Sequence, residues 1–349
     1  MQSKKTLITV VIIIALIAGA GYISVNQSKP VDEINDPQTE TETSRITVYC
    51  STPGLATSLE KAFESEHGDV LDVVTGSWCR KLLTEIEAGE VVADVIYGAE
   101  PIYFNKLISY DVLIEHDGSY NNLKDEFITD ETHYTLANGR YGVIIYNVNM
   151  VTNTPTTWTD LTNPEYTGLV ALPNAATCAT AYAIIGGLVD NQNYGWEYIT
   201  ALKENGVLLV DTGGNVPKTV ASGEAAVGIA PVDAAIRMIN SAKKEGVESP
   251  LRIVWPEEGV ISIPRPIGII SDDQRTEAET EIAQEFVDYV MSEDAQTLAV
   301  KQGFISSNIN VNSPAGAPDT IPLISVEWNT VLENESTIKE TFEQLMAEE

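Results

Sequence analysis

The feature that most constrains the fold is a repeated alternation of short apolar strands with amphipathic helices. The first series begins at Ile46 and ends at Tyr97. Its expected strands are 46–49, 70–74 and 91–97, and its expected helices are 55–67 and 82–88. Strands that alternate with helices favour a mainly parallel sheet whose faces are covered by the helices.

A second series of the same kind follows later in the chain. Its expected strands are 168–172, 207–210 and 226–230, and its expected helices are 180–189, 196–204, 216–222 and 234–244. Two further apolar strands, 141–147 and 263–270, are placed so that they could cross between the two series. We also expect one long amphipathic helix over 277–302 and a last helix over 326–346.

The length of the chain, 349 residues, is large for a single core and typical of two domains. We therefore expect two α/β lobes, each a mainly parallel sheet flanked by helices. The expected lobe 1 comprises 45–142 and 262–315, and the expected lobe 2 comprises 143–261 and 316–349.

The N-terminal segment has the pattern of an export signal. Lys4 and Lys5 precede an uncharged stretch whose apolar part runs from Leu7 to Ile23. Its length favours an uncleaved signal anchor over residues 1–28, and cleavage as a signal peptide remains the alternative. Residues 29–44 are polar and predict a disordered linker. The folded part is expected on the extracellular face of the membrane, or periplasmic or secreted after cleavage.

Charge and motifs exclude several classes of function. The formal net charge of -31 is incompatible with general nucleic-acid binding, which needs a basic face. The nucleophile elbow G-x-S-x-G, the phosphate-binding P-loop and the zinc motif H-E-x-x-H are absent from the sequence. The three histidines, His67, His116 and His133, are scattered without metal-ligand spacing. We expect a binding protein and not an enzyme.

The turns after the strands are the expected position of a binding site. In open parallel sheets, ligands bind beyond the carboxyl ends of the strands. Several of these turns lead into helices, whose free N–H groups favour anions. The turns in question are 50–54, 76–80, 98–101, 174–180, 212–216 and 231–233.

Several segments resemble the ferric-iron-type solute-binding proteins of ABC importers. They are GSWCRKLLTEIEAGEVVADVIYGAE (76–100), TWTDLTNPEYTGLVALPNAATCATAY (157–182), GWEYITALKENG (195–206), VASGEAAVGIAPVD (220–233), WPEEG (255–259) and VMSEDAQTLAVKQGF (290–304). The resemblance extends from about Arg45 to the C-terminus. It implies a two-lobed, periplasmic-binding-protein-like (type II) fold that closes over a ligand. It also implies a monomer that works with an ABC permease and its cytoplasmic ATPase.

The resemblance does not determine the ligand, because members of this broad family bind ferric iron, phosphonates, sugar phosphates or thiamine. Many ferric-binding members carry two neighbouring tyrosines soon after the strand that reads VGIA here. The corresponding segment of this chain, 228–235, contains no Tyr. This difference disfavours ferric iron held by tyrosines.

The three cysteines lead to the first ligand hypothesis. Cys50, Cys79 and Cys178 all lie in turns that are expected to face the cleft. Thiolates bind soft metals and iron–sulfur species, so the three could hold bound iron, another soft metal or an iron–sulfur species as cargo. Trp78 could shield such a site and Arg80 could offset its negative charge. The plainer alternatives are small buried residues and a Cys50–Cys79 disulfide.

The second ligand hypothesis is a phosphonate, an organophosphate or another small anion. Hydroxyls from Ser51, Thr52, Ser77, Thr177 and Thr180 accompany the helix N-termini at the expected cleft, and Arg80 would pair with the anion. Asp233 would contribute from the second lobe. Helix capping is the plainer role for any single Ser or Thr. A third class, a surface scaffold without transport function, also remains open.

Overall fold

The computed structural model describes residues 44–115 and 120–347, all of which belong to the unit Thr43–Glu349. The expected anchor (1–28) and nearly all of the expected linker (29–44) lie outside the described residues, as does His116. Within the described ranges, none of the helices combines the length and the apolar character that a membrane span requires.

The first half of the unit confirms the predicted alternation of strands and helices. Strands β1 and β2 and strands β1 and β3 pair in parallel. Proline in the first turn starts both α1 and α3, where its missing N–H removes no helical hydrogen bond. Helix α3 was not predicted. The elements are β1 (Ile46–Cys50), α1 (Pro53–His67), β2 (Leu71–Thr75), α2 (Trp78–Ala88), β3 (Val95–Tyr97) and α3 (Pro101–Ser109).

The second half repeats this architecture, with β5 parallel to both β6 and β7. All seven predicted elements are present. They are β5 (Val170–Pro173), α4 (Ala179–Asp190), α5 (Gly195–Glu204), β6 (Leu208–Val210), α6 (Val216–Ser222), β7 (Val227–Pro231) and α7 (Val232–Lys244). We call the half built on β1–β3 lobe 1 and the half built on β5–β7 lobe 2.

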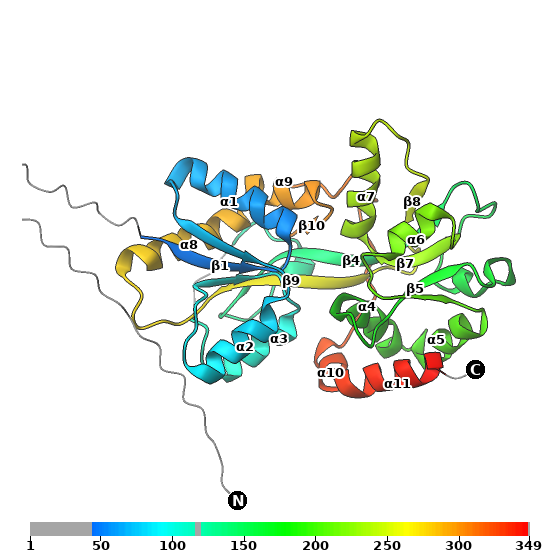
Figure 1. Ribbon diagram of the computed structural model, residues 1–349, viewed down its shortest axis with the longest axis horizontal. Coiled ribbons are helices and arrows are strands. Elements are labelled where there is room, and N and C mark those ends of the chain that lie inside the picture. Colours follow the sequence, from blue (N-terminus) through cyan, green and yellow to red (C-terminus); the bar gives the residue numbers. More distant parts are fainter. Residues whose placement is uncertain (1–43, 116–119, 348–349) are drawn as a thin grey trace, which may run out of the picture. The chain divides into compact units, whose positions relative to one another are not determined.

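Two long antiparallel strands, β4 (Thr135–Asn147) and β9 (Ile261–Ile269), run from one lobe into the other (Figure 1). The sheet order is β2-β1-β3-β9-β4-β7-β5-β6, so β9 continues the sheet of lobe 1 and β4 continues that of lobe 2. Two short strands, β8 (Leu251–Val254) and β10 (Ile305–Ser306), also pair with β4. Strand β4 begins earlier than the predicted 141–147.

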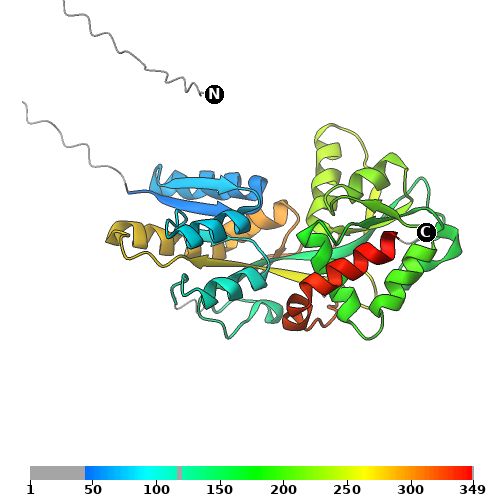
Figure 2. The same ribbon diagram turned by 60° about the horizontal axis from the view of Figure 1, so that its bottom comes forward.

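The C-terminal part differs from the prediction in its helix breaks. The single helix predicted over 277–302 is wrong, because Ser292 separates α8 (Glu277–Met291) from α9 (Glu293–Lys301). Ser292 has extended backbone, and its hydroxyl accepts a hydrogen bond from the N–H of Ala295, which caps α9. The predicted last helix is likewise divided, into α10 (Trp328–Glu333) and α11 (Glu335–Ala347). Figure 2 shows α11 against the helices of lobe 2, where it contacts α4 and α5.

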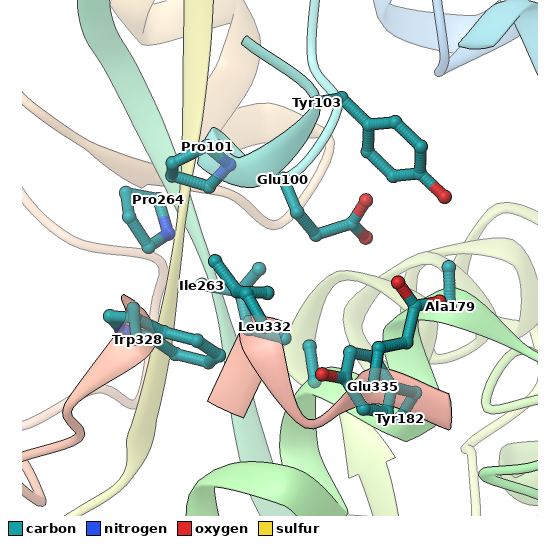
Figure 3. Close-up of a pocket in the computed structure, with 11 residues that line it drawn as sticks. Glu100, Pro101, Tyr103, Ala179, Tyr182, Ile263, Pro264, Trp328, Leu332 and Glu335 are labelled. Carbon is teal, nitrogen blue, oxygen red and sulfur yellow. The ribbon is translucent and has the colours of Figure 1, made fainter. Parts of the chain in front are cut away.

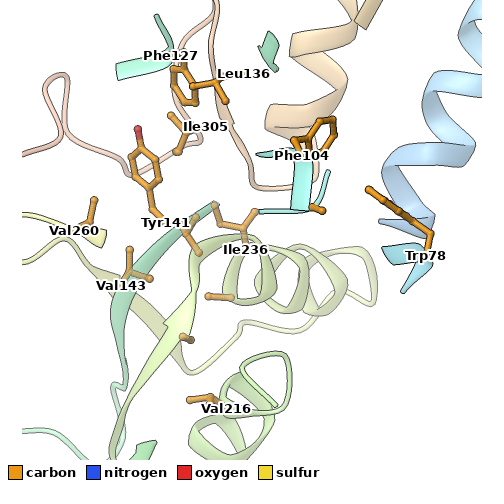
Figure 4. Close-up of a cluster of buried hydrophobic side chains, with 14 of the residues drawn as sticks. Trp78, Phe104, Phe127, Leu136, Tyr141, Val143, Val216, Ile236, Val260 and Ile305 are labelled. Carbon is orange, nitrogen blue, oxygen red and sulfur yellow. The ribbon is translucent and has the colours of Figure 1, made fainter. Parts of the chain in front are cut away.

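The hydrophobic core lies on both faces of the sheet. One cluster fills lobe 1 beneath α1, α8 and α9, and another fills lobe 2 beneath α4 and α5. A third cluster extends from Trp78 and Phe104 in lobe 1, past Tyr141 on β4, to Val216 in lobe 2 (Figure 4). The crossing strands are therefore packed continuously through both lobes.

The lobes meet closely at Gly303, two residues after the end of α9. Its φ is +94°, and a Cβ there would lie 2.7 Å from the Cα of Asp233 and 3.0 Å from the Cβ of Ile236, both on α7. Only a residue without a side chain fits this contact, because left-handed backbone and a close approach coincide.

We predict that Gly303→Ala lowers the free energy of unfolding by about 3 kcal/mol, since it combines backbone strain with overpacking. The matched control is Gly246→Ala, where φ is +74° but nothing lies within 4 Å of the added Cβ. Backbone strain alone should cost about 1 kcal/mol there. Urea unfolding of both variants measures the difference, and equal losses would contradict the close interlobe contact.

Candidate functional site

Two arginines lie in the middle of the largely buried crossing strands. Arg140 is on β4 and Arg265 is on β9, at the place where the carboxyl ends of strands from both lobes meet. Arg237 and Asp233 join them from the first turns of α7. We call these four residues the guanidinium cluster. Phe304 lies within the cluster, with its ring centroid 5.5 Å from Cζ of Arg140 and 4.5 Å from Cζ of Arg265.

Asp233 is the carboxylate of the cluster and is 1% exposed. Arg140 donates to it twice, from Nε to Oδ1 at 3.0 Å and from Nη2 to Oδ2 at 3.2 Å. Arg237 donates from Nη1 to Oδ2 at 2.5 Å. Burial alone would raise the pKa of Asp233, but the positive charges of Arg140 and Arg237 outweigh it and the pKa lies below its ordinary value.

Arg265 is buried and makes its contacts with lobe 1. Its Nη2 donates to Ser51 Oγ at 2.7 Å, to Thr52 Oγ1 at 3.0 Å and to the carbonyl of Gly98 at 3.1 Å. Burial, followed by the charge of Arg140, lowers the pKa of Arg265, yet a guanidinium stays protonated in proteins. Its Nη1 has no hydrogen-bond partner among the described residues.

The cluster therefore carries three positive charges and one negative charge. Buried charge is costly unless it is paired, and the pairing here is incomplete. A buried side-chain oxygen beside it, Asn138 Oδ1, also lacks a partner among the residues described. Chemically, the arrangement suits a ligand that brings negative charge and hydrogen-bond acceptors.

Four of the predicted binding residues gather at the cluster. Ser51 and Thr52 contact Arg265 from lobe 1, Thr180 Oγ1 accepts from Arg140 Nη1 at 2.9 Å from lobe 2, and Asp233 is the shared carboxylate. Strand ends from both lobes thus supply polar groups at one place, and that a ligand binds there stays a prediction.

The other predicted binding residues lie apart from these contacts. Ser77, Arg80 and Thr177 are exposed, and Thr177 Oγ1 donates to the carbonyl of Asp211 at 3.5 Å. Trp78 is 2% exposed and packs in the core, where its Nε1 donates to the carbonyl of Tyr97 at 3.2 Å. Trp78 therefore serves the packing of lobe 1.

The three cysteines are free thiols that the structure does not bring together. Cys50 packs in the cluster beneath α1, whereas Cys79 packs against the cluster on the other face of the lobe 1 sheet. Cys178 precedes α4 in lobe 2. Within 44–115 and 120–347, no three His, Cys, Asp or Glu side chains are placed to hold a metal ion. The expected site of three thiolates is thus not formed here.

Sequence reasoning missed the arginines of the crossing strands, Arg140 and Arg265, and also Arg237. The available signal was a single charged residue within each of two apolar strands, ANGRYGVII and SIPRPIGII. A charge within a buried strand is rare unless it is paired or functional, so these two positions were identifiable as candidates.

A pocket between the lobes begins one residue from Thr180, at Ala179. In Figure 3, Glu100 and Tyr103 enter it from lobe 1, and Tyr182 and Glu335 enter it from lobe 2. The remaining lining is mostly apolar: Pro101, Ala183, Ile263, Pro264, Trp328 and Leu332. Burial, followed by the charges of Cys79 and Glu100, raises the pKa of Tyr103 to about 12, so its hydroxyl stays protonated at neutral pH.

Comparison with protein families identifies the class of protein to which this chain belongs. The profile of the family described as bacterial extracellular solute-binding protein matches residues 90–334. The chain belongs to this family. An uncharacterized protein of Haemophilus influenzae is 25% identical over 311 residues, which cover 81% of this chain and 85% of that protein.

Solved structures share the fold. The periplasmic binding protein AfuA from Actinobacillus pleuropneumoniae, with exogenous fructose-6-phosphate bound, has a TM-score of 0.70 at 19% identity and covers 87% of this chain and 98% of its own. The apo ferric ion-binding protein A of Pasteurella haemolytica has a TM-score of 0.72 at 17% identity, with the same coverage. Iron-bound HitA from Pseudomonas aeruginosa has a TM-score of 0.68 at 18% identity, covering 85% and 99%. At these identities the likeness shows the two-lobed type II fold, as predicted.

We predict that Asp233→Asn lowers the free energy of unfolding at neutral pH by about 3 kcal/mol, because it removes the one carboxylate among three guanidiniums. The folded-state pKa of Asp233 is lowered, so its contribution is present above the unfolded value of about 4 and is lost as pH falls through the folded pKa. Urea unfolding at a series of pH values should show a constant difference from pH 6 to 8 that shrinks below about pH 4. The exposed control Asp211→Asn should show little change at any pH.

We predict that iodoacetamide modifies Cys178 of the native protein well before Cys50 or Cys79. Burial raises the pKa of the Cys50 thiol, and burial followed by the charge of Glu100 raises that of Cys79 to about 12, so few reactive thiolates form. Cys178 is partly exposed at the N-terminus of α4. Peptide mapping by mass spectrometry gives the order, and labelling of Cys79 as fast as Cys178 would contradict it.

Proposed function

We propose that this protein is the substrate-binding component of an ABC importer and that it captures a small phosphorylated or phosphonate solute between its lobes. The observation that carries the proposal is the guanidinium cluster, in which Asp233 pairs with Arg140 and Arg237 and is the one carboxylate beside three guanidiniums, including Arg265. A doubly charged phosphate would balance the charge of the cluster, and guanidinium groups match phosphate oxygens in geometry.

The anion would contact both lobes and the strands between them. Ser51 and Thr52 approach from lobe 1, Thr180 from lobe 2, and Arg140 and Arg265 from the crossing strands. A ligand with greater affinity for the arrangement in which these groups converge shifts the population toward the closed form. Capture followed by delivery to a permease and its ATPase requires no chemistry on the solute.

The rest of the solute would extend toward the interlobe pocket of Figure 3, whose cavity of about 20 Å³ would have to widen to admit it. Its apolar wall and the aromatic rings of Tyr103, Tyr182 and Trp328 suit a carbon skeleton, while Glu100 and Glu335 can accept hydrogen bonds from hydroxyl or amino groups. The binding of fructose-6-phosphate by AfuA makes sugar phosphates the first class of solute to test.

Iron or another metal is the competing cargo, supported by the ferric-binding relatives. Two observations favour an anionic solute over a metal ion as the cargo. Residues 231–235 of this chain read Pro-Val-Asp-Ala-Ala, without tyrosine. The described residues also contain no cluster of three His, Cys, Asp or Glu that could coordinate a metal.

A thermal-shift panel of inorganic phosphate, sugar phosphates and phosphonates, with ferric and zinc ions alongside, tests the proposal. We expect at least one phosphorus oxyanion to raise the melting temperature. Calorimetry should then show that Arg140→Gln weakens its binding roughly 30-fold or more, since truncating one partner of a buried charge pair costs about 2 kcal/mol at least.

Two further variants keep the result interpretable if Arg140→Gln folds poorly. Ser51→Ala retains every charge and should weaken binding modestly, because one hydroxyl that orders Arg265 is lost. Arg252→Gln, which removes an exposed guanidinium paired with Glu248, should bind like the wild type. Stabilisation by a metal ion alone, with no response to any phosphorus oxyanion, would contradict the proposal.

A further inference from the structure

A groove with four cationic side chains lies between α7 of lobe 2 and the C-terminal end of α9 in lobe 1. Arg237, Lys243 and Lys244 line it from α7, and Lys301 lines it from α9. The remaining described lining residues are uncharged and polar. We call this surface the α7/α9 groove.

The groove contrasts with the charge of the whole chain. The sequence has 51 acidic and only 20 basic residues. Elsewhere, Lys81, Arg252 and Lys339 each pair with a glutamate four residues away. Within the described ranges, no carboxylate forms an ion pair with Lys243, Lys244 or Lys301, so their charges remain available to an anion.

The inner end of the groove reaches the guanidinium cluster. Arg237 belongs to both, since it lines the groove and donates to Asp233 at 2.5 Å. Gly303, two residues after Lys301, would place a Cβ 2.7 Å from the Cα of Asp233. On α7, Arg237, Ser241 and Lys244 recur at helical spacing along one face. Positive charge therefore continues from the surface to the buried arginines.

We propose that the α7/α9 groove is the electrostatic entrance of the binding site, which collects an anionic solute and guides it to the guanidinium cluster. The inference rests on the proposed function and adds the route of capture. A net charge of -31 repels anions, but at physiological salt the screening length is about 8 Å. Distant acidic residues are then screened, while cations that line the groove act at short range. Such focusing raises association rates by roughly tenfold to a thousandfold.

Stopped-flow tryptophan fluorescence with inorganic phosphate as the probe separates association from dissociation, and Trp328 in the interlobe pocket provides a reporter. We expect Lys244→Gln combined with Lys301→Gln to lower the association rate constant by about tenfold at about 10 mM ionic strength, with an unchanged dissociation rate constant. The difference should disappear at about 1 M ionic strength.

The matched control, Lys106→Gln combined with Lys203→Gln, removes one lysine from each lobe away from the groove and should leave both rates unchanged. The variant with Lys244→Arg and Lys301→Arg keeps the charge and should associate like the wild type. Two results would overturn the proposal that the groove is an entrance. One is an unchanged association rate constant in the glutamine variant, and the other is weaker binding that arises only from a faster dissociation rate constant. A wild-type protein that binds no phosphorus oxyanion would instead overturn the proposed function, and the entrance with it.

Discussion

The antiparallel pairing of β4 with β9 is the constraint on which the site depends. The register sets Arg140 opposite Ile263 and Asn138 opposite Arg265, so the two arginines are diagonal neighbours on one face of the ladder. A shift of the pairing register by one residue would move one guanidinium to the other face of the sheet and separate the residues of the cluster. Because the same two strands join the lobes, the pairing that connects the lobes also places the charges between them.

Within the guanidinium cluster, electrostatic repulsion and the cost of burial oppose the attraction between the arginines and Asp233. Arg140 and Arg265 repel one another, and burial removes the water that would otherwise stabilise them. Asp233 offsets part of this charge, and Phe304 fills the space beside both guanidiniums. Arg237 then adds a further positive charge from the surface side. The protein retains an incompletely neutralised interior, which is the condition under which a bound anion contributes most.

Much of the fold was predictable because strand and helix periodicity are local properties of the sequence. The two βαβ series follow from hydrophobic spacing. Four residues of the expected site, Ser51, Thr52, Thr180 and Asp233, contact the arginines of the crossing strands, and their role in binding stays a prediction. The predictions that were wrong or missing depend on information that hydrophobic periodicity does not carry. Ser292 divides the predicted helix 277–302 through a cap, although the apolar pattern continues across it. The sheet face taken by Cys50 is not encoded by its pattern, because Tyr49 and Cys50 are both buried on opposite faces. The roles of Arg140 and Arg265 depend on a register that only the folded sheet defines.

The chain as a whole carries a large negative charge, whereas the guanidinium cluster carries a net positive charge. This difference affects which solutes can approach the cluster. An acidic exterior keeps anions at a distance unless a local positive field outweighs it, and that field is concentrated along α7, the end of α9 and the crossing strands. The arginines of β4 and β9 belong to neither lobe alone, whereas the hydroxyls that orient them come from one lobe each. The proposed anion would therefore touch three parts of the molecule at once. If the proposed function holds, few lobe positions would satisfy all three together, so the same set of contacts would recognise the charge and favour the closed form.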